Sequence, residues 1–129
     1  MELRVARHTN NLQILIDFYT STLGLIVLGS FEDHAGYNGV FLGEENSNWH
    51  IEFTEDSNVA NHHPDEDDLL VFYFPGEHER NTIKQNFIDS NISEMVPKNP
   101  YWKKNGVCFK DPDGYGIILA INNLSAENQ

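Results

Sequence analysis

The most informative stretch of the chain is TNNLQILIDFYTSTLGL, residues 9–25. Its apolar side chains recur at helical spacing: Leu12, Leu15, Ile16, Tyr19 and Leu23. This spacing places them on one face and predicts an amphipathic helix over residues 11–23. Asn10 or Asn11 is a suitable residue for the amino-terminal cap. Gly24 fits the position just after the helix, where a left-handed backbone favours a residue without a Cβ atom.

Strand-like segments surround this helix. One precedes it at residues 3–8, and three follow it, at residues 25–31, 37–42 and 49–54. The turn-rich sequences HAG and GEENSN separate the last three. The first half of the chain is therefore predicted to have the order β-α-β-β-β.

The same order recurs after a polar connector, residues 55–68, which we expect to be exposed. The expected elements are a strand at 69–74, a helix at 77–91, a short strand at 94–96, a loop at 97–106, and strands at 107–110 and 115–121. The sequence Asp111-Pro112-Asp113-Gly114 is typical of a tight turn between the last two strands. Two such modules make an α+β fold, whose sheets can face each other and enclose a cleft.

Composition narrows the classes of function. The 129 residues, 40% of them hydrophobic, fit one ordinary globular domain. Twenty acidic against eight basic residues give a formal charge of −12, which repels phosphate backbones and anionic membranes. We therefore expect neither a nucleic-acid partner nor a membrane partner. The chain shows neither a leader pattern nor an apolar run near the ~18 residues of a membrane span, so we expect a cytoplasmic protein.

Two phrases carry a resemblance to a known family. Residues 9–25 resemble the first helix and turn of the vicinal oxygen chelate superfamily, which groups glyoxalases, bleomycin-resistance proteins and ring-cleaving dioxygenases. The sequence DPDGYGIILAI, residues 111–121, resembles its last hairpin, with HIEF lying between the two phrases. Further similarity to the YycE-like branch lies in RVAR, HAGYNGVFLG, HIEFTE, LLVFYFPG and NPYW.

The resemblance implies the glyoxalase/bleomycin-resistance fold, with two paired βαβββ modules around a cleft. Residues 1–129 would form one such domain, with module one at about 3–54, the connector at 55–68 and module two at about 69–121. It also implies a homodimer, which is plausible for a protein with sheet edges that a second chain can complete.

The resemblance further implies a divalent metal on the cleft floor, bound by His, Gln or Glu from the first and last strands of each module. In this chain those positions fall on Arg4, Glu52, Asp68 or Leu69, and Ile118. Among Arg4, Glu52 and Ile118, Glu52 is the one ordinary metal ligand. An arginine that keeps its proton repels a cation. We therefore expect no metal cofactor at the usual site.

Strand alternation places Arg4, Ala6 and His8 on one face of their strand. It does the same for His50, Glu52 and Thr54. If the family register holds, both sets face the cleft. Our hypothesis is that the Arg4 guanidinium takes the space of a metal and binds the Glu52 carboxylate through its planar fork. Such a pair serves either as a structural ion pair or as a ligand contact.

An alternative site uses a divalent metal held by His8, His50 and Glu52. That metal would polarise a substrate oxygen or activate a water. The protein would then be a metal-dependent lyase, isomerase or oxygenase, either a glyoxalase-like lyase or a dioxygenase-like oxidoreductase.

Aromatic residues add candidate contacts. Tyr101 and Trp102 lie in the expected loop, where they either cap the core or contact a ligand. Strand aromatics could line the cleft on a face that depends on the register: Phe41, Trp49, Phe72 and Tyr73. Cys108, between Val107 and Phe109, is typical of a small buried residue.

Three functions follow from these observations. The first is metal-free binding of a small molecule, for example sequestration of an antibiotic. Its expected ligand-binding residues are Arg4, His8, His50, Glu52, Tyr73, Tyr101 and Trp102. The second is the metal-dependent enzyme, and the third is a protein-interaction module without a ligand.

Overall fold

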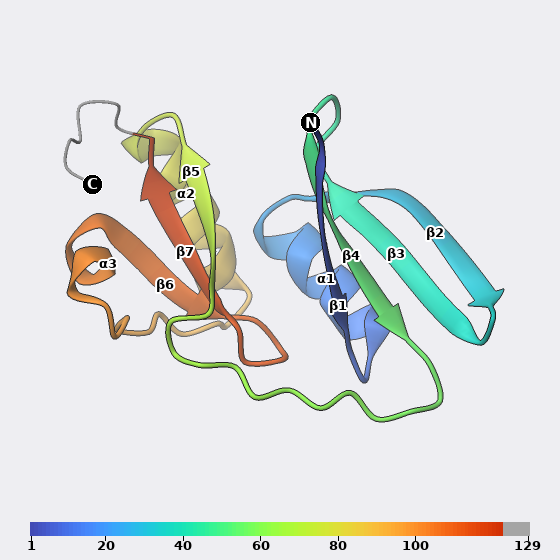
Figure 1. Ribbon diagram of the computed structural model, residues 1–129. Coiled ribbons are helices and arrows are strands. Elements are labelled where there is room, and N and C mark those ends of the chain that lie inside the picture. Colours follow the sequence, from blue (N-terminus) through green and yellow to red (C-terminus); the bar gives the residue numbers. More distant parts are fainter. Residues whose placement is uncertain (123–129) are drawn as a thin grey trace. The chain divides into compact units, whose positions relative to one another are not determined.

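The computed structural model describes residues 1–122, and its contacts divide the chain into two compact units (Figure 1). Unit one is Met1–His62, and unit two begins at His63. Each unit holds one β-sheet, called sheet one and sheet two, with a helix packed on it.

Unit one confirms the predicted β-α-β-β-β order. Its elements are β1 (Leu3–His8), α1 (Leu12–Thr22), β2 (Ile26–His34), β3 (Tyr37–Gly43) and β4 (Trp49–Glu55). The strand order in sheet one is β1-β4-β3-β2. The first pair, β1 with β4, is parallel, and the other pairs are antiparallel.

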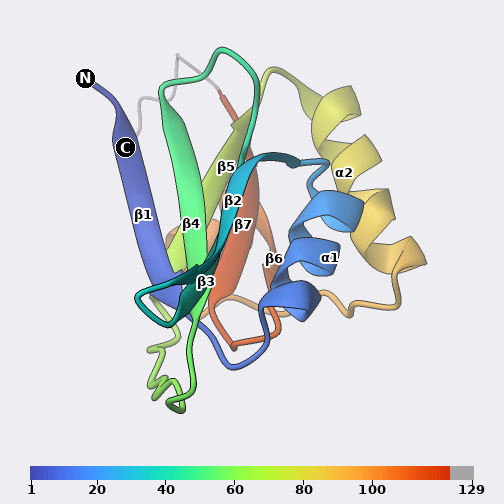
Figure 2. The same cartoon turned by 90° about the vertical axis from the view of Figure 1, so that its right-hand side faces the viewer.

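The caps of α1 are those that the sequence predicts. The Asn11 side chain accepts a hydrogen bond from the backbone N–H of Ile14 at 3.2 Å, which satisfies a donor of the first turn. Gly24 has φ +72°, a left-handed conformation that costs glycine little. Figure 2 shows α1 on one face of sheet one.

The core of unit one lies between α1 and its sheet. Buried side chains of α1, such as Leu15 and Tyr19, meet buried residues of β3 and β4, and the Tyr19 and Phe53 rings lie 5.2 Å apart. Burial of these large apolar side chains stabilises each by about 1.5–3 kcal/mol.

Unit two contains two more helices and a smaller sheet. Its elements are β5 (Leu69–Phe74), α2 (Glu77–Asp89), α3 (Pro100–Asn105), β6 (Gly106–Lys110) and β7 (Gly116–Ile121). The strand order in sheet two is β5-β7-β6, with β5 parallel to β7. Phe87 of α2 stacks on Phe109 of β6, with ring centroids 4.3 Å apart.

Two predictions for unit two are wrong. The strand expected at 94–96 is reduced to one bridge, in which the Met95 N–H donates to the Cys108 carbonyl. The expected loop at 97–106 contains α3, which begins at Pro100 after an Asn99 cap. Pro97 and Pro100 lack the N–H that a strand ladder needs, whereas proline suits the first turn of a helix.

The predicted turn before β7 is confirmed. The Gly114 N–H donates to the Asp111 carbonyl at 2.9 Å, and Gly114 has φ +92°. The Asp111 side chain accepts from the N–H groups of Asp113 and Tyr115.

The helices described are short. The longest, α2, has 13 residues, whereas a membrane span needs about 20, and no helix of residues 1–122 qualifies as a span.

Candidate functional site

The face of sheet one opposite α1 is the candidate site. The parallel register pairs Arg4 with His50, Ala6 with Glu52 and His8 with Thr54. Alternation puts all six on one face, as predicted, while Ile51 and Phe53 point to the core. We call this surface the polar face, made of Arg4, His8, Phe41, His50, Glu52 and Thr54 with their neighbours on the same side.

Arg4 is held by three neighbours on the polar face. Its Nε donates a hydrogen bond to His50 Nε2 at 2.8 Å, and its guanidinium carbon lies 4.6 Å from the centre of the Phe41 ring. Its Nη1 lies 3.8 Å from Glu52 Oε1. The hydrogen bond, the ring contact and the ion pair together hold the Arg4 guanidinium in place, although its side chain is 50% exposed.

The predicted fork between Arg4 and Glu52 is wrong in its geometry. Arg4 Nη1 and Glu52 Oε1 form a single ion pair at 3.8 Å, not the two parallel hydrogen bonds that the fork would make. The reason is the register: Arg4 lies directly opposite His50, and Glu52 lies one row further along the sheet. Arg4 therefore reaches Glu52 diagonally and gives its Nε to the histidine.

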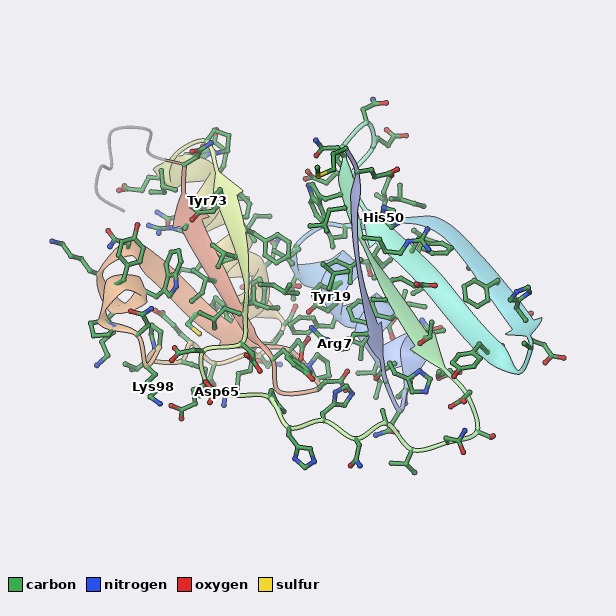
Figure 3. All side chains as sticks on the ribbon, viewed as in Figure 1. Arg7, Tyr19, His50, Asp65, Tyr73 and Lys98 are labelled. Atoms are coloured by element: carbon green, nitrogen blue, oxygen red, sulfur yellow. The ribbon has the colours of Figure 1, made fainter. Side chains whose placement is uncertain are left out.

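The same contact indicates which nitrogen of the His50 ring accepts a hydrogen bond. Because the arginine N–H donates, His50 Nε2 must offer a lone pair. The other ring nitrogen, Nδ1, then carries the proton and lies 3.6 Å from the Glu2 carboxylate. Figure 3 labels His50 on β4.

Aromatic rings pack beside this cluster. Phe41 lies next to Phe31 at 5.9 Å and meets the His50 ring edge-on at the same distance. The Phe31 ring covers Gly39, where any Cβ atom would overlap it. Glycine at position 39 therefore leaves room for the Phe31 ring to approach the backbone of the sheet.

A second polar group lies at the far end of β1. His8 Nδ1 lies 2.8 Å from Thr54 Oγ1, and His8 Nε2 lies 2.9 Å from Asp56 Oδ1. Asp56 also accepts from the Asn58 N–H at 3.0 Å. The hydrogen bond from that N–H, followed by the one from His8, lowers the pKa of Asp56 below its usual value of 3.8.

Unit two uses the corresponding face differently. On sheet two, the face opposite α2 carries the buried residues Cys108, Ile118 and Ala120, with Leu69, Val71 and Trp102 packed against them. Trp102 therefore caps a core, one of the two roles predicted for it. Tyr101 meets Trp102 edge-on at 4.8 Å and is exposed, as is Tyr73 on β5 (Figure 3).

The register also places the other strand aromatics. By alternation, Phe41 and Tyr73 lie on the faces opposite the helices, whereas Trp49 and Phe72 lie on the helix sides. Trp49 and Phe72 are therefore excluded as residues that line a cleft on the faces opposite the helices.

A small pocket lies at one end of sheet two. It measures about 60 Å³ and is lined in part by Asp65, Lys98 and Cys108 (Figure 3). Drug-sized ligands occupy roughly 300–1,000 Å³, so the pocket is too small for one. Burial raises the pKa of the Cys108 thiol, which keeps it in the unreactive form, as expected of a packing residue.

Comparison with known proteins identifies the family. The model of the YycE-like N-terminal domain matches residues 3–54, and that of the YycE-like C-terminal domain matches residues 67–121. The chain belongs to the YycE-like family. Protein YycE of Bacillus subtilis (strain 168) is 38% identical over 121 residues, which are 92% of this chain and 86% of that protein.

Solved structures place this YycE-like chain in a larger superfamily. The crystal structure of Bacillus subtilis YycE matches with TM-score 0.84 and 37% identity, over 92% of this chain and 88% of that chain. Glyoxalase I of Leishmania major matches with TM-score 0.74 and 23% identity, over 98% and 90%. TnmS3, an antibiotic-binding protein from Streptomyces, matches with TM-score 0.68 and 16% identity, over 95% and 96%.

These matches confirm the predicted fold class. The YycE-like chain has the α+β glyoxalase/bleomycin-resistance fold, built from two modules. The predicted membership of the vicinal oxygen chelate superfamily, in its YycE-like branch, is also confirmed.

The donors on sheet one do not fit the metal that this superfamily commonly holds. The resemblance implies that Arg4 stands at the position of the first ligand, and a guanidinium that keeps its proton has no lone pair to give. The Nε2 lone pair of His50 is taken by Arg4, and both ring nitrogens of His8 have partners. Within residues 1–122, no group of three or more His, Cys, Asp or Glu is placed to hold a metal ion. The alternative site of His8, His50 and Glu52 stays a prediction.

Sequence reasoning missed the third member of the His8 group. Asp56 belongs to the connector that its composition predicts to be exposed, yet the Asp56 side chain is 11% exposed. The next residues are also tied to unit one, because Asn10 and Ala60 exchange hydrogen bonds. The available signal was the aspartate two residues after Thr54, at the end of a strand that runs parallel to β1.

Proposed function

We propose that this protein binds a small molecule on the polar face, without a metal, and that Arg4 is the fixed cationic anchor of the ligand. The observation that carries the proposal is the position of Arg4. It is held on the polar face against Phe41, His50 and Glu52, and the family resemblance implies that metal-dependent relatives have a ligand of the ion at this position.

Arg4 keeps donors for a ligand. A guanidinium has five N–H groups, and the hydrogen bond to His50 uses the one on Nε. Its Nη1 lies 3.8 Å from Glu52, which is beyond hydrogen-bond distance, so the N–H groups of Nη1 can still bind a ligand oxygen. The contacts that hold Arg4 reduce the entropy that a ligand would lose by ordering it.

The ligand would meet one charge of each sign and a flat apolar surface. Glu52 supplies the negative charge, and the rings of Phe31 and Phe41 supply the apolar surface. An oxyanion or carbonyl oxygen suits Arg4. TnmS3, which has this fold, is an antibiotic-binding protein, so the fold is compatible with binding alone.

A thermal-shift screen tests this function. The protein is treated with a chelator, and its melting temperature is measured with cationic antibiotics, thiols and small carbonyl and carboxylate compounds. A ligand at 100 times its Kd stabilises the folded state by about 2.7 kcal/mol. We expect at least one compound to raise the melting temperature in the presence of chelator.

Matched variants assign the effect to Arg4. Arg4→Gln removes the anchor, whereas Arg7→Gln changes the neighbouring arginine whose guanidinium lies over Phe53 on the other face. We expect the ligand effect to disappear in the first variant and to persist in the second. A ligand effect that needs added metal, or that survives Arg4→Gln, would contradict the proposal.

We also propose that the protein forms a homodimer. The edge strand β2 of sheet one exposes Ile26, Val27 and Leu28, each between 41% and 50%. An edge strand with exposed apolar side chains can pair with a second chain. Light scattering coupled to size-exclusion chromatography should give twice the 14.8 kDa mass, and a monomeric mass at high concentration would refute the dimer.

A further inference from the structure

We propose that Asp56, His8 and Thr54 form a hydrogen-bonded relay that activates the Thr54 hydroxyl for acyl transfer from an activated ester. This activity goes beyond small-molecule binding at Arg4, because it uses none of the contacts of Arg4. It rests on three side chains that the parallel pairing of β1 and β4 brings together.

The geometry supplies the first step. His8 and Thr54 are directly opposite in the register, and the His8 ring lies between two partners. Thr54 Oγ1 is 2.8 Å from Nδ1, and Asp56 Oδ1 is 2.9 Å from Nε2. A hydroxyl, an imidazole and a carboxylate in hydrogen-bonded sequence are the parts of an activated nucleophile.

The chemistry of Asp56 fixes the direction of both hydrogen bonds. Asp56 is a carboxylate at neutral pH, as an aspartate ordinarily is, and a carboxylate only accepts hydrogen bonds. His8 Nε2 must therefore carry the proton. In the neutral ring Nδ1 is then the acceptor, so the Thr54 hydroxyl donates to it.

In this arrangement the Thr54 hydroxyl donates its proton in a hydrogen bond to a base, and the lone pairs of its oxygen remain available for attack. In the proposed step, Thr54 Oγ1 forms a bond to the acyl carbon of an ester while its proton passes to His8 Nδ1. The ester C–O bond breaks and the alcohol part leaves as an oxyanion. Asp56 stabilises the imidazolium that forms, which is the role of the acidic member of such a relay.

Water completes the cycle. The proton on His8 first passes to the departing alkoxide or to solvent, which restores the neutral imidazole. A water oxygen then bonds to the acyl carbon as one of its protons passes to His8 Nδ1. The bond to Thr54 Oγ1 breaks, that proton passes from His8 to Thr54, and a carboxylic acid is released. No metal, oxidant or other co-reactant is needed.

The relay is accessible to a small reagent. The His8 side chain is 29% exposed, and Thr54 is half-buried. Tyr37 packs its ring edge-on against His8 at 5.6 Å, which further limits the rotation of the imidazole. The group is therefore ordered without being sealed.

Reaction with p-nitrophenyl acetate tests the relay. The full chain is mixed with the ester, release of nitrophenolate is followed by absorbance, and the acetylated residue is found by peptide mass spectrometry. We expect one acetyl group on Thr54. The rate should fall by about 100-fold or more in Thr54→Val and in His8→Asn, because general-base assistance is lost.

Conservative and remote variants separate chemistry from folding. Thr54→Ser keeps the hydroxyl and should remain acetylated at position 54. Thr20→Val removes a hydroxyl that bonds within α1, and His34→Asn removes a histidine of β2, so both should react like the wild type. Melting curves measured by circular dichroism identify any variant that fails to fold. If a variant fails, the site of acetylation in the wild type still tests the relay.

Asp56 acts through His8, so its test uses a spectroscopic signal. In nitrogen-15 spectra the neutral His8 ring should carry its proton on Nε2, and Asp56→Asn should weaken this preference and slow acetylation. Three results would each overturn the relay. The first is acetylation of the wild type at other residues only. The second is acetylation of the wild type and of Thr54→Ser that is no faster than that of free threonine, and the third is a neutral His8 protonated on Nδ1.

Discussion

On sheet one, the face opposite the helix carries Arg4, His50 and Glu52, whereas on sheet two the equivalent face carries Cys108, Ile118 and Ala120. The two sheets share a topology, with a parallel outer pair next to an antiparallel strand. The same positions of the fold therefore hold a charged cluster in one unit and a sealed apolar cluster in the other.

The registers make the contrast specific. The pair Arg4 and His50 corresponds to Leu69 and Gly116, and the pair Ala6 and Glu52 corresponds to Val71 and Ile118. Trp102 of α3 covers the cluster in unit two, and unit one has no helix in the corresponding place. We infer that sheet two contributes stability through this face and that sheet one keeps its face for binding.

The largest difference should come from Ile118. Ile118→Ala removes a fully buried side chain from the apolar cluster, and we expect it to lower the free energy of unfolding by about 2–5 kcal/mol. Urea unfolding followed by circular dichroism measures the change. A loss below about 1 kcal/mol would mean that this face of sheet two is not a stabilising core.

Gly106 tests the closeness of the cap. A Cβ atom at position 106 would lie 2.6 Å from Ile118 Cγ2 and 3.2 Å from Trp102 Cε3. Gly106→Ala should therefore cost about 1–3 kcal/mol through overpacking. Gly76→Ala is the control, because its Cβ meets only the flexible end of Glu79, and a similar loss in both variants would argue against a tight cap.

Glu52 should affect stability much less than Ile118. Its partner Arg4 is half-exposed, so Glu52→Gln leaves no buried unpaired cation, and we expect a loss under about 1 kcal/mol. A cost above about 2 kcal/mol in urea unfolding would show that the pair serves mainly to hold the fold. Ligand binding, measured by thermal shift, should change in this variant.

The smallest effect should appear in acid. The folded-state pKa of Asp56 is lowered, so its contribution to stability is present above the usual value of 3.8 and is lost as the pH falls through the lower, folded value. Asp56→Asn should remove this part of the pH dependence. Melting temperatures of the two proteins, recorded from neutral pH downward, should converge in acid, and parallel curves would contradict the assignment.

Periodicity predicted much of the fold because it is a local signal. The helix at Leu12–Thr22 and the strands Leu3–His8 and Leu69–Phe74 follow from spacing and from turn residues. The six residues of α3 are too few to show a helical periodicity, although Asn99-Pro100 is a good start for a helix.

Sequence could name the members of the polar face but not their pairing. Alternation places Arg4 and Glu52 on one side, yet only the parallel register shows that Arg4 faces His50 and that His8 faces Thr54. The link from His8 to Asp56 depends in addition on the path of the chain after β4. Contacts between residues about 46 positions apart are therefore not readable from local pattern.

Calorimetric titration of nickel or zinc into chelator-treated, untagged protein tests the central claim most directly. We expect no site at one equivalent per chain in the wild type, because Arg4 donates to His50 Nε2 and pairs with Glu52, which leaves these two donors occupied. Stoichiometric binding that disappears in Glu52→Gln would contradict the claim, since it would show that Glu52 serves a metal and not the arginine.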